Sequence, residues 1–233
     1  MKTGSVSGTS AAALAAAITA GGRSRRFGQD KALYSVRGVP LLHRVAASLE
    51  GYAPKLLIAP EGQYTLAGWT QHADLRPGDG PLAGLETALS MLTAAQTSAP
   101  GVPAAAPLWL AFAAVDMPNL SVQYWRLLAS QIAPESAWPS VQAVLGLDPR
   151  QRPQPLAGLY HASLLPLVTG LLDVGERRMQ ALLERLTPGG TAALTDPDHA
   201  VPDRAAPGCL FVSSEHIEAV CPGAYVNLNT PPA

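Results

Sequence analysis

The chain has 233 residues, 48% of them hydrophobic, which suits one α/β domain with a sizeable core. Its formal net charge of −1 gives no overall positive field, so we expect neither nucleic acid nor an acidic membrane surface as a partner. No run reaches the ~20 apolar residues that a membrane-spanning helix needs. The two cysteines, Cys209 and Cys221, lie outside any CxxC or His/Cys pattern, so we expect neither a zinc site nor a disulfide.

The N-terminal residues are small and polar, and we expect residues 1–12 to be a disordered tail before a single domain at 13–233. The apolar stretch that follows fits either the core of a short signal peptide or a buried first strand at Leu14–Thr19. The strand is favoured because the next residues form a loop that such a strand would carry. We therefore expect a cytoplasmic protein.

Apolar runs typical of strands alternate along the chain with periodic stretches typical of helices. Further strands are predicted at 55–59, 71–75, 108–115, 141–145, 156–160, 209–213 and 225–228. Helices are predicted at 40–49, 81–92, 122–132, 163–172 and 176–186. This alternation implies right-handed βαβ units. The predicted fold is a single-domain, Rossmann-like three-layer α/β fold, with a mostly parallel sheet and helices on both faces.

Residues 20–31, AGGRSRRFGQDK, follow the first predicted strand. The three glycines let the backbone turn tightly and present successive amides to an anion. Arg26 and Lys31 add positive charge at the rim of this loop. The segment fits neither the dinucleotide pattern G-x-G-x-x-G nor the Walker pattern. A surface turn with solvated arginines is the alternative, but the position after a strand favours a loop that holds a nucleoside triphosphate.

Asp116 ends the apolar run 108–115 and is followed by Met117 and Pro118. A carboxylate directly after a buried strand is costly unless it is solvated, paired or bound to a metal. Magnesium sites near phosphates use one or two carboxylates together with phosphate oxygens and water. The pattern favours Asp116 as a Mg²⁺ ligand over the alternative, a cap for the following helix or turn.

Asp74 lies at the end of a short predicted strand, before a glycine-rich turn. Gly80 and Gly84 in this region would let the backbone pass close to a base or a sugar. An ordinary strand–turn–helix connection explains the same residues equally well.

Two late motifs are also polar. Arg177 and Arg178 open a predicted helix, where a solvated helix face is the simpler interpretation. Asn227 and Asn229 would point the same way on an extended segment and could face a polar ligand, with a polar turn closed by Pro231 as the alternative.

Taken together, these segments resemble the molybdenum cofactor guanylyltransferase family, within the larger group of sugar-nucleotidyltransferase-like enzymes. The matching pieces run in the family's order along nearly the whole chain, at 20–31, 80–84, 116–118, 175–178 and 227–231. The first motif indicates the broad nucleotidyltransferase group, and the last two favour the molybdenum cofactor branch.

The resemblance implies that the terminal phosphate of molybdopterin attacks the α-phosphate of GTP, giving a guanine dinucleotide cofactor and pyrophosphate, with Mg²⁺ as cofactor. Its implied nucleotide-binding residues are Thr19, Ala20, Gly21, Gly22, Lys31, Asp74 and Asp116, and Asp116 would hold the metal. Its implied acceptor-binding residues are Arg26, Gly80, Gly84, Arg177, Asn227 and Asn229. Catalysis would rest on Arg26, Lys31 and Asp116.

The chain departs from the family pattern at three places: Thr19 replaces a usual Leu, Ala59 stands where an Asn is common, and the chain ends at Ala233 without the usual final helix. No Ser/His/Asp or Cys/His set is apparent, so we expect direct in-line transfer. CTP, a sugar or other alcohol phosphate as acceptor, or a nucleotide-binding regulator without turnover remain alternatives. We expect a monomer or a weak homo-oligomer.

Overall fold

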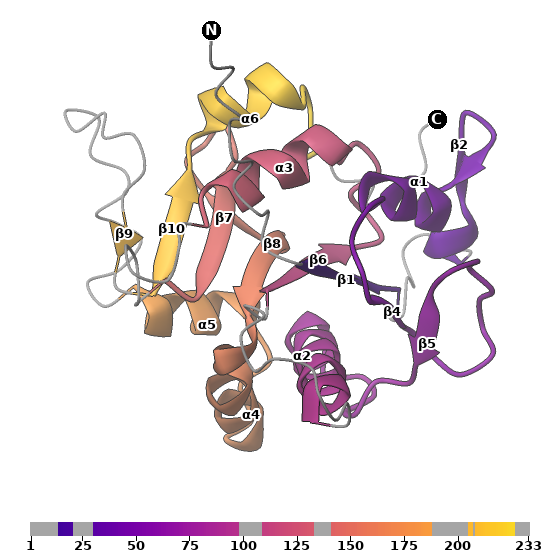
Figure 1. The fold of residues 1–233 in the computed structure, drawn as a ribbon, viewed down its shortest axis with the longest axis vertical. Coiled ribbons are helices and arrows are strands. Elements are labelled where there is room, and N and C mark those ends of the chain that lie inside the picture. The colour runs from indigo at the N-terminus through magenta and orange to yellow at the C-terminus, as the bar shows by residue number, and fades with distance from the viewer. Residues whose placement is uncertain are drawn as a thin grey trace, which may run out of the picture.

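The computed structural model describes residues 14–20, 30–97, 109–132, 141–187, 205–206 and 208–226. These residues build one central sheet between two layers of helices (Figure 1). Its strands are β1 (Leu14–Thr19), β4 (Lys55–Ile58), β5 (Thr70–His72), β6 (Trp109–Ala114), β7 (Ala143–Leu147), β8 (Pro153–His161), β9 (Ala205–Ala206) and β10 (Cys209–Val212). The helices are α1 (Leu41–Ser48), α2 (Pro81–Thr97), α3 (Val122–Ser130), α4 (Leu165–Asp173), α5 (Met179–Leu186) and α6 (Ser214–Val220), with 3₁₀ turns η1 (Lys31–Leu33) and η2 (Ala162–Leu164).

The strand order is β5-β4-β1-β6-β8-β7-β10-β9. Parallel pairing joins β5, β4, β1 and β6, and also joins β7 to β10, whereas β8 runs antiparallel between β6 and β7, and β9 antiparallel to β10. The chain builds β4 and β5 on one side of β1 and then places β6 on the other side. Ligands of open α/β sheets bind beyond the carboxyl ends of the strands at such a reversal. The prediction of a mostly parallel sheet is confirmed.

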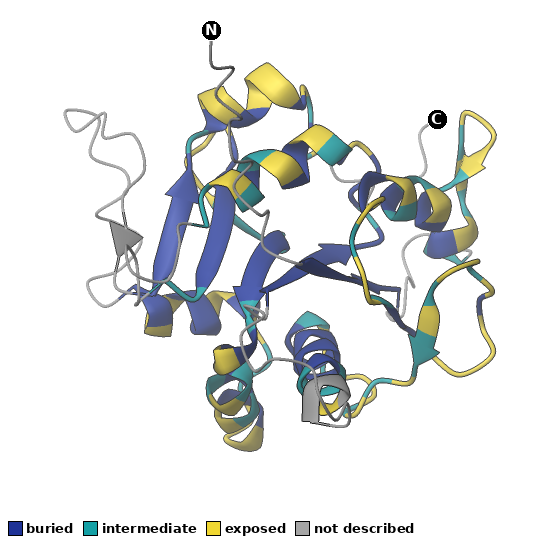
Figure 2. Ribbon diagram, in the orientation of Figure 1, coloured by how far each residue is buried: buried dark blue, intermediate teal, exposed yellow. Residues whose placement is uncertain are grey.

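Each face of the sheet has its own helical layer and its own apolar cluster. Helices α1, α3 and α6 cover one face, and α2, α4 and α5 cover the other (Figure 1). Successive residues of β1 serve opposite clusters, with Ala16 and Ile18 in the first and Ala15 and Ala17 in the second, as the two-residue period of a strand requires. All residues of β1 and β6 are buried, so only the ends of these strands are open to a ligand (Figure 2).

Local signals set several helix starts. The hydroxyl of Ser121 accepts the N–H of Tyr124 at the start of α3, and Ser213 does the same for the N–H of His216 in α6. Such caps each contribute about 1 kcal/mol. Pro81 is the first residue of α2, where its missing N–H leaves no hydrogen bond unmade.

Several predicted element ends are displaced. Pro40 ends the short strand β3 (Val39–Pro40) rather than opening α1. Helix α5 begins at Met179 and not at residue 176, because the carboxylate of Glu176 accepts the backbone N–H groups of Arg177 and Arg178. These two amides are therefore held outside the helix.

Several elements went unpredicted, including β9 and η1, and two others show why. The first is the hairpin of β2 (Ser35–Val36) and β3, whose turn at Arg37 and Gly38 has positive φ angles of 54° and 79°. The second is α6, where Ser214 and Ile217 are the buried residues, too few for a clear periodic pattern. Strand β8 begins earlier than predicted, at Pro153, and β7 begins later than predicted, at Ala143.

The last predicted strand, 225–228, is wrong at its first two residues. Tyr225 lies in a turn, and its ring meets the ring of Tyr124 edge-on with centroids 5.8 Å apart. Val226 follows this turn and belongs to no strand, and residues 227 and 228 lie outside the described part of the chain. Cys209 and Cys221 are buried and form no disulfide, as expected. None of the helices in the described ranges is long and apolar enough to cross a membrane.

Candidate active site

The ends of four strands form one row across the sheet. The register aligns Thr19 at the end of β1 with Ile58 on β4 and with Ala114 on β6, and it aligns Ile58 with His72 on β5. Hydrogen bonds continue the row past the strands: the N–H of Ala20 donates to Ile58. Residues that directly follow these strands are therefore gathered at one edge of the sheet.

Lys31 and Asp116 meet at this edge from segments far apart in the sequence. The Nζ of Lys31 lies 3.2 Å from Oδ2 of Asp116, and their side chains are only 13% and 19% exposed. Helix α3 is capped by Ser121, so the alternative role of Asp116 as a helix cap is contradicted. The pair is screened less by solvent than a surface ion pair would be, which strengthens its field at the strand ends.

The second oxygen of Asp116 suits a metal ion. Asp116 Oδ1 is buried and, among the described residues, accepts no hydrogen bond. A buried carboxylate oxygen without a partner carries a desolvation cost that a cation or a donor would remove. The described residues contain no cluster of three or more metal-ligating side chains. Because its Oδ1 has no hydrogen-bond partner among these residues, Asp116 fits an ion that is held by one carboxylate together with phosphate oxygens and water, as Mg²⁺ commonly is.

Both carboxylate oxygens of Asp30, the residue before Lys31, accept hydrogen bonds. Its Oδ1 accepts the N–H of Ala32 at 3.0 Å and so caps η1, the turn that carries Lys31. Tyr64 Oη lies 2.8 Å from its Oδ2, and Gln63 Nε2 donates to the same oxygen at 2.9 Å. Sequence reasoning missed Tyr64 and Gln63, because the connection between β4 and β5 has no periodicity or motif to mark them.

Asp74 is a half-buried carboxylate just after β5. Its Oδ1 accepts the N–H of Arg76 at 3.1 Å and lies 3.2 Å from Oγ1 of Thr87 on α2. Burial raises the pKa of Asp74, although both contacts counteract the rise. Because the N–H of Arg76 and the hydroxyl of Thr87 both contact Oδ1, these two groups fix the orientation of the Asp74 side chain.

Gly84 has a packing role that the sequence did not indicate. A Cβ at this position would lie 3.0 Å from Oγ1 of Thr19, so α2 approaches β1 closely at the end of the strand. Gly80 instead needs its positive φ of 80°, and a Cβ there would lie 3.8 Å from the carbonyl oxygen of Arg177. Gly80 and Arg177, both predicted to face the acceptor, are thus neighbours.

Two ion pairs join the segment before α2 to the segment that starts at Asp173, the last residue of α4. Arg76 Nη2 lies 2.6 Å from Asp173, and Arg177 Nε lies 3.0 Å from Asp79, so each segment supplies one arginine and one aspartate. Arg76 also binds both oxygens of Glu86, whose side chain is 5% exposed. This double clamp, Arg76–Asp173 and Arg177–Asp79, holds the neighbourhood of Asp74 next to that of Arg177.

The guanidinium groups of Arg177 and Arg178 have different surroundings. Arg177 Nη1 donates to the carbonyl of Leu172 at 3.1 Å in addition to its pairing with Asp79. Arg178 pairs with Glu176, and its side chain is 66% exposed. The solvated interpretation thus describes Arg178 and not Arg177.

The structure brings together the described members of the predicted nucleotide site at or beside the strand ends: Thr19, Ala20, Lys31, Asp74 and Asp116. Gly21, Gly22, Arg26, Asn227 and Asn229 lie outside the described residues. Ala59, in place of the usual Asn, is buried and donates its N–H to the carbonyl of His72.

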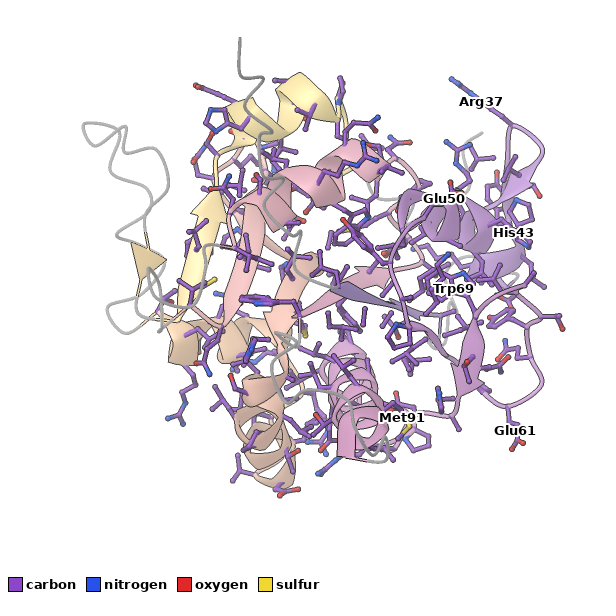
Figure 3. The ribbon with its side chains drawn as sticks, viewed as in Figure 1. Arg37, His43, Glu50, Glu61, Trp69 and Met91 are labelled. Atoms are coloured by element: carbon purple, nitrogen blue, oxygen red, sulfur yellow. The ribbon has the colours of Figure 1, made fainter. Side chains whose placement is uncertain are left out.

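A surface hollow of about 270 Å³ lies away from this edge. His43, Glu50 and Trp69 line it (Figure 3), together with Lys55, the first residue of β4. Since Lys55 begins the strand whose other end reaches the site, the hollow belongs to the opposite edge of the sheet.

A sheet of this topology, with a Lys–Asp pair at its strand ends, is typical of nucleotide-binding α/β proteins. Residues 16–189 match the family model of the MobA-like NTP transferase domain, and the chain belongs to this family of nucleotidyltransferases.

Known relatives agree with this assignment. Over 167 residues the chain is 50% identical to the probable molybdenum cofactor guanylyltransferase of Deinococcus radiodurans, which covers 72% of this chain and 77% of that protein. A protein of the same description from Opitutus terrae is 32% identical over 179 residues, covering 76% and 80%. The molybdopterin-guanine dinucleotide biosynthesis protein A of Archaeoglobus fulgidus has the same fold, with a TM-score of 0.62, 21% identity and coverage of 93% and 92%.

Proposed function

We propose that this chain transfers GMP from GTP to the phosphate of molybdopterin, giving a guanine dinucleotide cofactor and pyrophosphate. The observation that carries the proposal is the Lys31–Asp116 pair, which lies just after β6 and leaves one buried carboxylate oxygen without a partner among the described residues. The names of the relatives from Deinococcus radiodurans and Opitutus terrae supply the substrates.

The chemistry demands positioning and charge neutralisation more than covalent help from the protein. In the proposed reaction, an oxygen of the acceptor phosphate attacks the α-phosphorus of GTP, and the bond to the β-phosphate oxygen breaks as pyrophosphate leaves. Lys31 would hold the triphosphate as a compact charge, and its ammonium is held in place by Asp116 at 3.2 Å. Holding both reactants in line is the larger part of the catalysis.

A magnesium ion belongs to this proposal. Asp116 Oδ1 would be its protein ligand, with the remaining positions filled by phosphate oxygens and water. The ion would supply neutralisation of the charge that develops on the phosphates. Lys31 binds the other oxygen, Oδ2, so the two cations would share one carboxylate.

The two substrates would lie on either side of the double clamp. Asp74, fixed by Thr87 and the backbone of Arg76, would face the guanosine part of GTP. Gly80 and Arg177 would face the pterin, with Arg26, Asn227 and Asn229 completing that side and Gly84 supporting it. Ala20, Gly21 and Gly22 would hold the GTP phosphates. We also propose a cytoplasmic protein that is a monomer or weak homo-oligomer without a nucleic-acid partner.

Nucleotide choice is tested by titrating the purified protein with GTP, CTP, ATP and UTP in the presence of Mg²⁺. We expect GTP to bind most tightly. CTP is the main alternative. Ala59 replaces an Asn that is common at this position in the family and helps to bind the nucleotide, so the choice of base has to be measured. Tighter binding of CTP than of GTP would contradict the guanylyl assignment while leaving a nucleotidyltransferase in place.

A further inference from the structure

The hydroxyl of Tyr64 lies between the two described ends of the glycine-rich segment. It is 2.8 and 2.9 Å from the carboxylate oxygens of Asp30, and 3.4 Å from the carbonyl oxygen of Ala20. Ala20 directly follows β1, and Asp30 directly precedes η1. One side chain from the β4–β5 connection therefore contacts the chain on both sides of residues 21–29.

The position of this hydroxyl is fixed by packing. Tyr64 is 8% exposed and belongs to the same apolar cluster as Ala20 and Ala32. Burial, followed by the hydrogen bond and the negative charge of Asp30, raises the pKa of Tyr64 well above its usual value of 10. The group consequently stays protonated and acts as a donor throughout the neutral range.

The hydrogen bonds that the Asp30 carboxylate accepts have two consequences for Lys31. First, Asp30 caps η1 through the N–H of Ala32, so its orientation sets the backbone that carries Lys31. Second, Tyr64 and Gln63 donate to the Asp30 carboxylate. Hydrogen bonds to a carboxylate disperse its charge, which lowers both its repulsion of a polyanion and its attraction for the neighbouring ammonium. Lys31 extends instead to Asp116, across the site.

We propose that Tyr64 is a positioning residue of the triphosphate site: by donating to Asp30, it fixes the turn from which Lys31 reaches the phosphates. The inference rests on the proposed function, because it assumes that Lys31 binds a nucleoside triphosphate. It goes further in assigning a role to a residue that lies outside every motif of the chain. Tyr64 acts through Asp30 and Lys31 and touches no reacting atom.

A double-mutant cycle with Lys31 tests this route. Affinity for Mg·GTP is measured by calorimetry on the full chain for wild type, Tyr64→Phe, Lys31→Met and the double variant. We expect Tyr64→Phe to weaken binding about 5- to 10-fold in the wild type and less than about 2-fold when Lys31 is already replaced. In turnover, the KM for GTP should rise by a similar factor while the KM for the acceptor stays unchanged.

Two variants serve as controls. Tyr52→Phe removes the same atom at the opposite edge of the sheet, where the N–H of the adjacent Ala53 donates to Leu14, the first residue of β1. Glu61→Gln removes a charge from the same connection as Tyr64, at a side chain that points outward (Figure 3). Both should leave the affinity for GTP and the KM values unchanged.

The proposal is overturned if Tyr64→Phe leaves the affinity for GTP unchanged, or weakens it equally in both backgrounds, since an equal loss means a route independent of Lys31. If Tyr64→Phe does not fold, the exposed Gln63 takes over the test: Gln63→Ala should cost about 2- to 3-fold in the wild type and nothing in Lys31→Met. Wild type that binds no nucleoside triphosphate would instead refute the proposed function itself.

Discussion

At the scale of single residues, the site depends on the partly buried ion pair of Lys31 and Asp116, in which the two carboxylate oxygens of Asp116 have different surroundings. Lys31 occupies Oδ2 of Asp116, while Oδ1 is buried without a hydrogen-bond partner among the described residues. Leaving a buried carboxylate oxygen unsatisfied is costly, and proteins tolerate the cost where a ligand removes it. A buried oxygen of this kind favours a binding site over a purely structural salt bridge.

Replacing Asp116 should separate metal dependence from nucleotide binding. We expect Asp116→Ala to lower kcat about 10³-fold, since a bound metal supplies several kcal/mol of charge stabilisation. Binding of GTP without Mg²⁺ should persist, because the change removes negative charge near the phosphates. Calorimetric titration with and without Mg²⁺ measures both effects, and a variant whose affinity for GTP still rises on adding Mg²⁺ would place the ion elsewhere.

Replacing Lys31 should act on the triphosphate directly. Lys31→Ala loses a charged hydrogen bond that is typically worth about 1.5–3 kcal/mol, so the affinity for GTP should fall about 10- to 100-fold. GMP, with a single phosphate, should lose less. Equal losses for GTP and GMP would show that Lys31 does not contact the outer phosphates.

Glu176 provides a pH-dependent test of the segment before α5. The hydrogen bond from Arg178, and then those from the N–H groups of Arg178 and Arg177, lower the pKa of Glu176 from 4.5 to about 2. A lowered folded-state pKa means that the contribution to stability is present above pH 4.5 and is lost as the pH falls towards 2. An NMR titration of the Glu176 carboxyl should therefore show a midpoint near 2, and Arg178→Gln should raise it. A midpoint near 4.5 in the wild type would contradict this arrangement.

At the scale of elements, the ring of Tyr225 packs closely against the backbone of β7 and fixes the end of the described chain, where no sequence pattern predicts a helix or a strand correctly. A Cβ on Gly146 of β7 would lie 1.8 Å from the hydroxyl oxygen of Tyr225, so this ring fills a notch that exists because the strand has a glycine there. The same hydroxyl lies 3.1 Å from that of Tyr124 on α3, which in turn donates to the carbonyl of Ala157 on β8. Tyr225 thus joins the end of the described chain to three other elements.

Filling the notch should cost stability. We expect Gly146→Ala to displace the ring of Tyr225 and to lower the free energy of unfolding by about 1–3 kcal/mol. Adding Tyr225→Phe removes the atom in closest conflict, so the two changes together should cost less than the sum of the separate changes. Urea unfolding of the four proteins measures this coupling, and simple additivity would show that the ring does not occupy the notch.

At the scale of the whole molecule, the sequence predicted those strands and helices whose pattern lies in their own consecutive residues. The buried run of β1, the apolar run ending at Asp116 and the helix-opening Pro81 each carry their own signal, and alternation of strands and helices implies the layered fold. The rule that ligands bind beyond the carboxyl ends of parallel strands indicated both the loop 20–31 and Asp116 as candidates for the site.

What the sequence did not predict depends on contacts between distant segments. The antiparallel insertion of β8, the contact of Tyr64 with Asp30 and the clamp between Arg76 and Asp173 have no pattern in the residues around them. Each arises because the fold brings together segments that no local rule relates. Gly84 is an example. The sequence suggested that this glycine gives the backbone freedom, whereas the structure shows that a side chain there would meet Thr19, because α2 packs closely against β1.

The proposed activity is the transfer of GMP from GTP to molybdopterin. It is tested most directly by incubating the protein with Mg²⁺, molybdopterin and GTP that carries a labelled α-phosphate. We expect the label to appear in a guanine dinucleotide, with one pyrophosphate released per label transferred and no reaction when Mg²⁺ is withheld. Transfer from labelled CTP in preference to GTP, or binding of GTP without release of pyrophosphate, would contradict it.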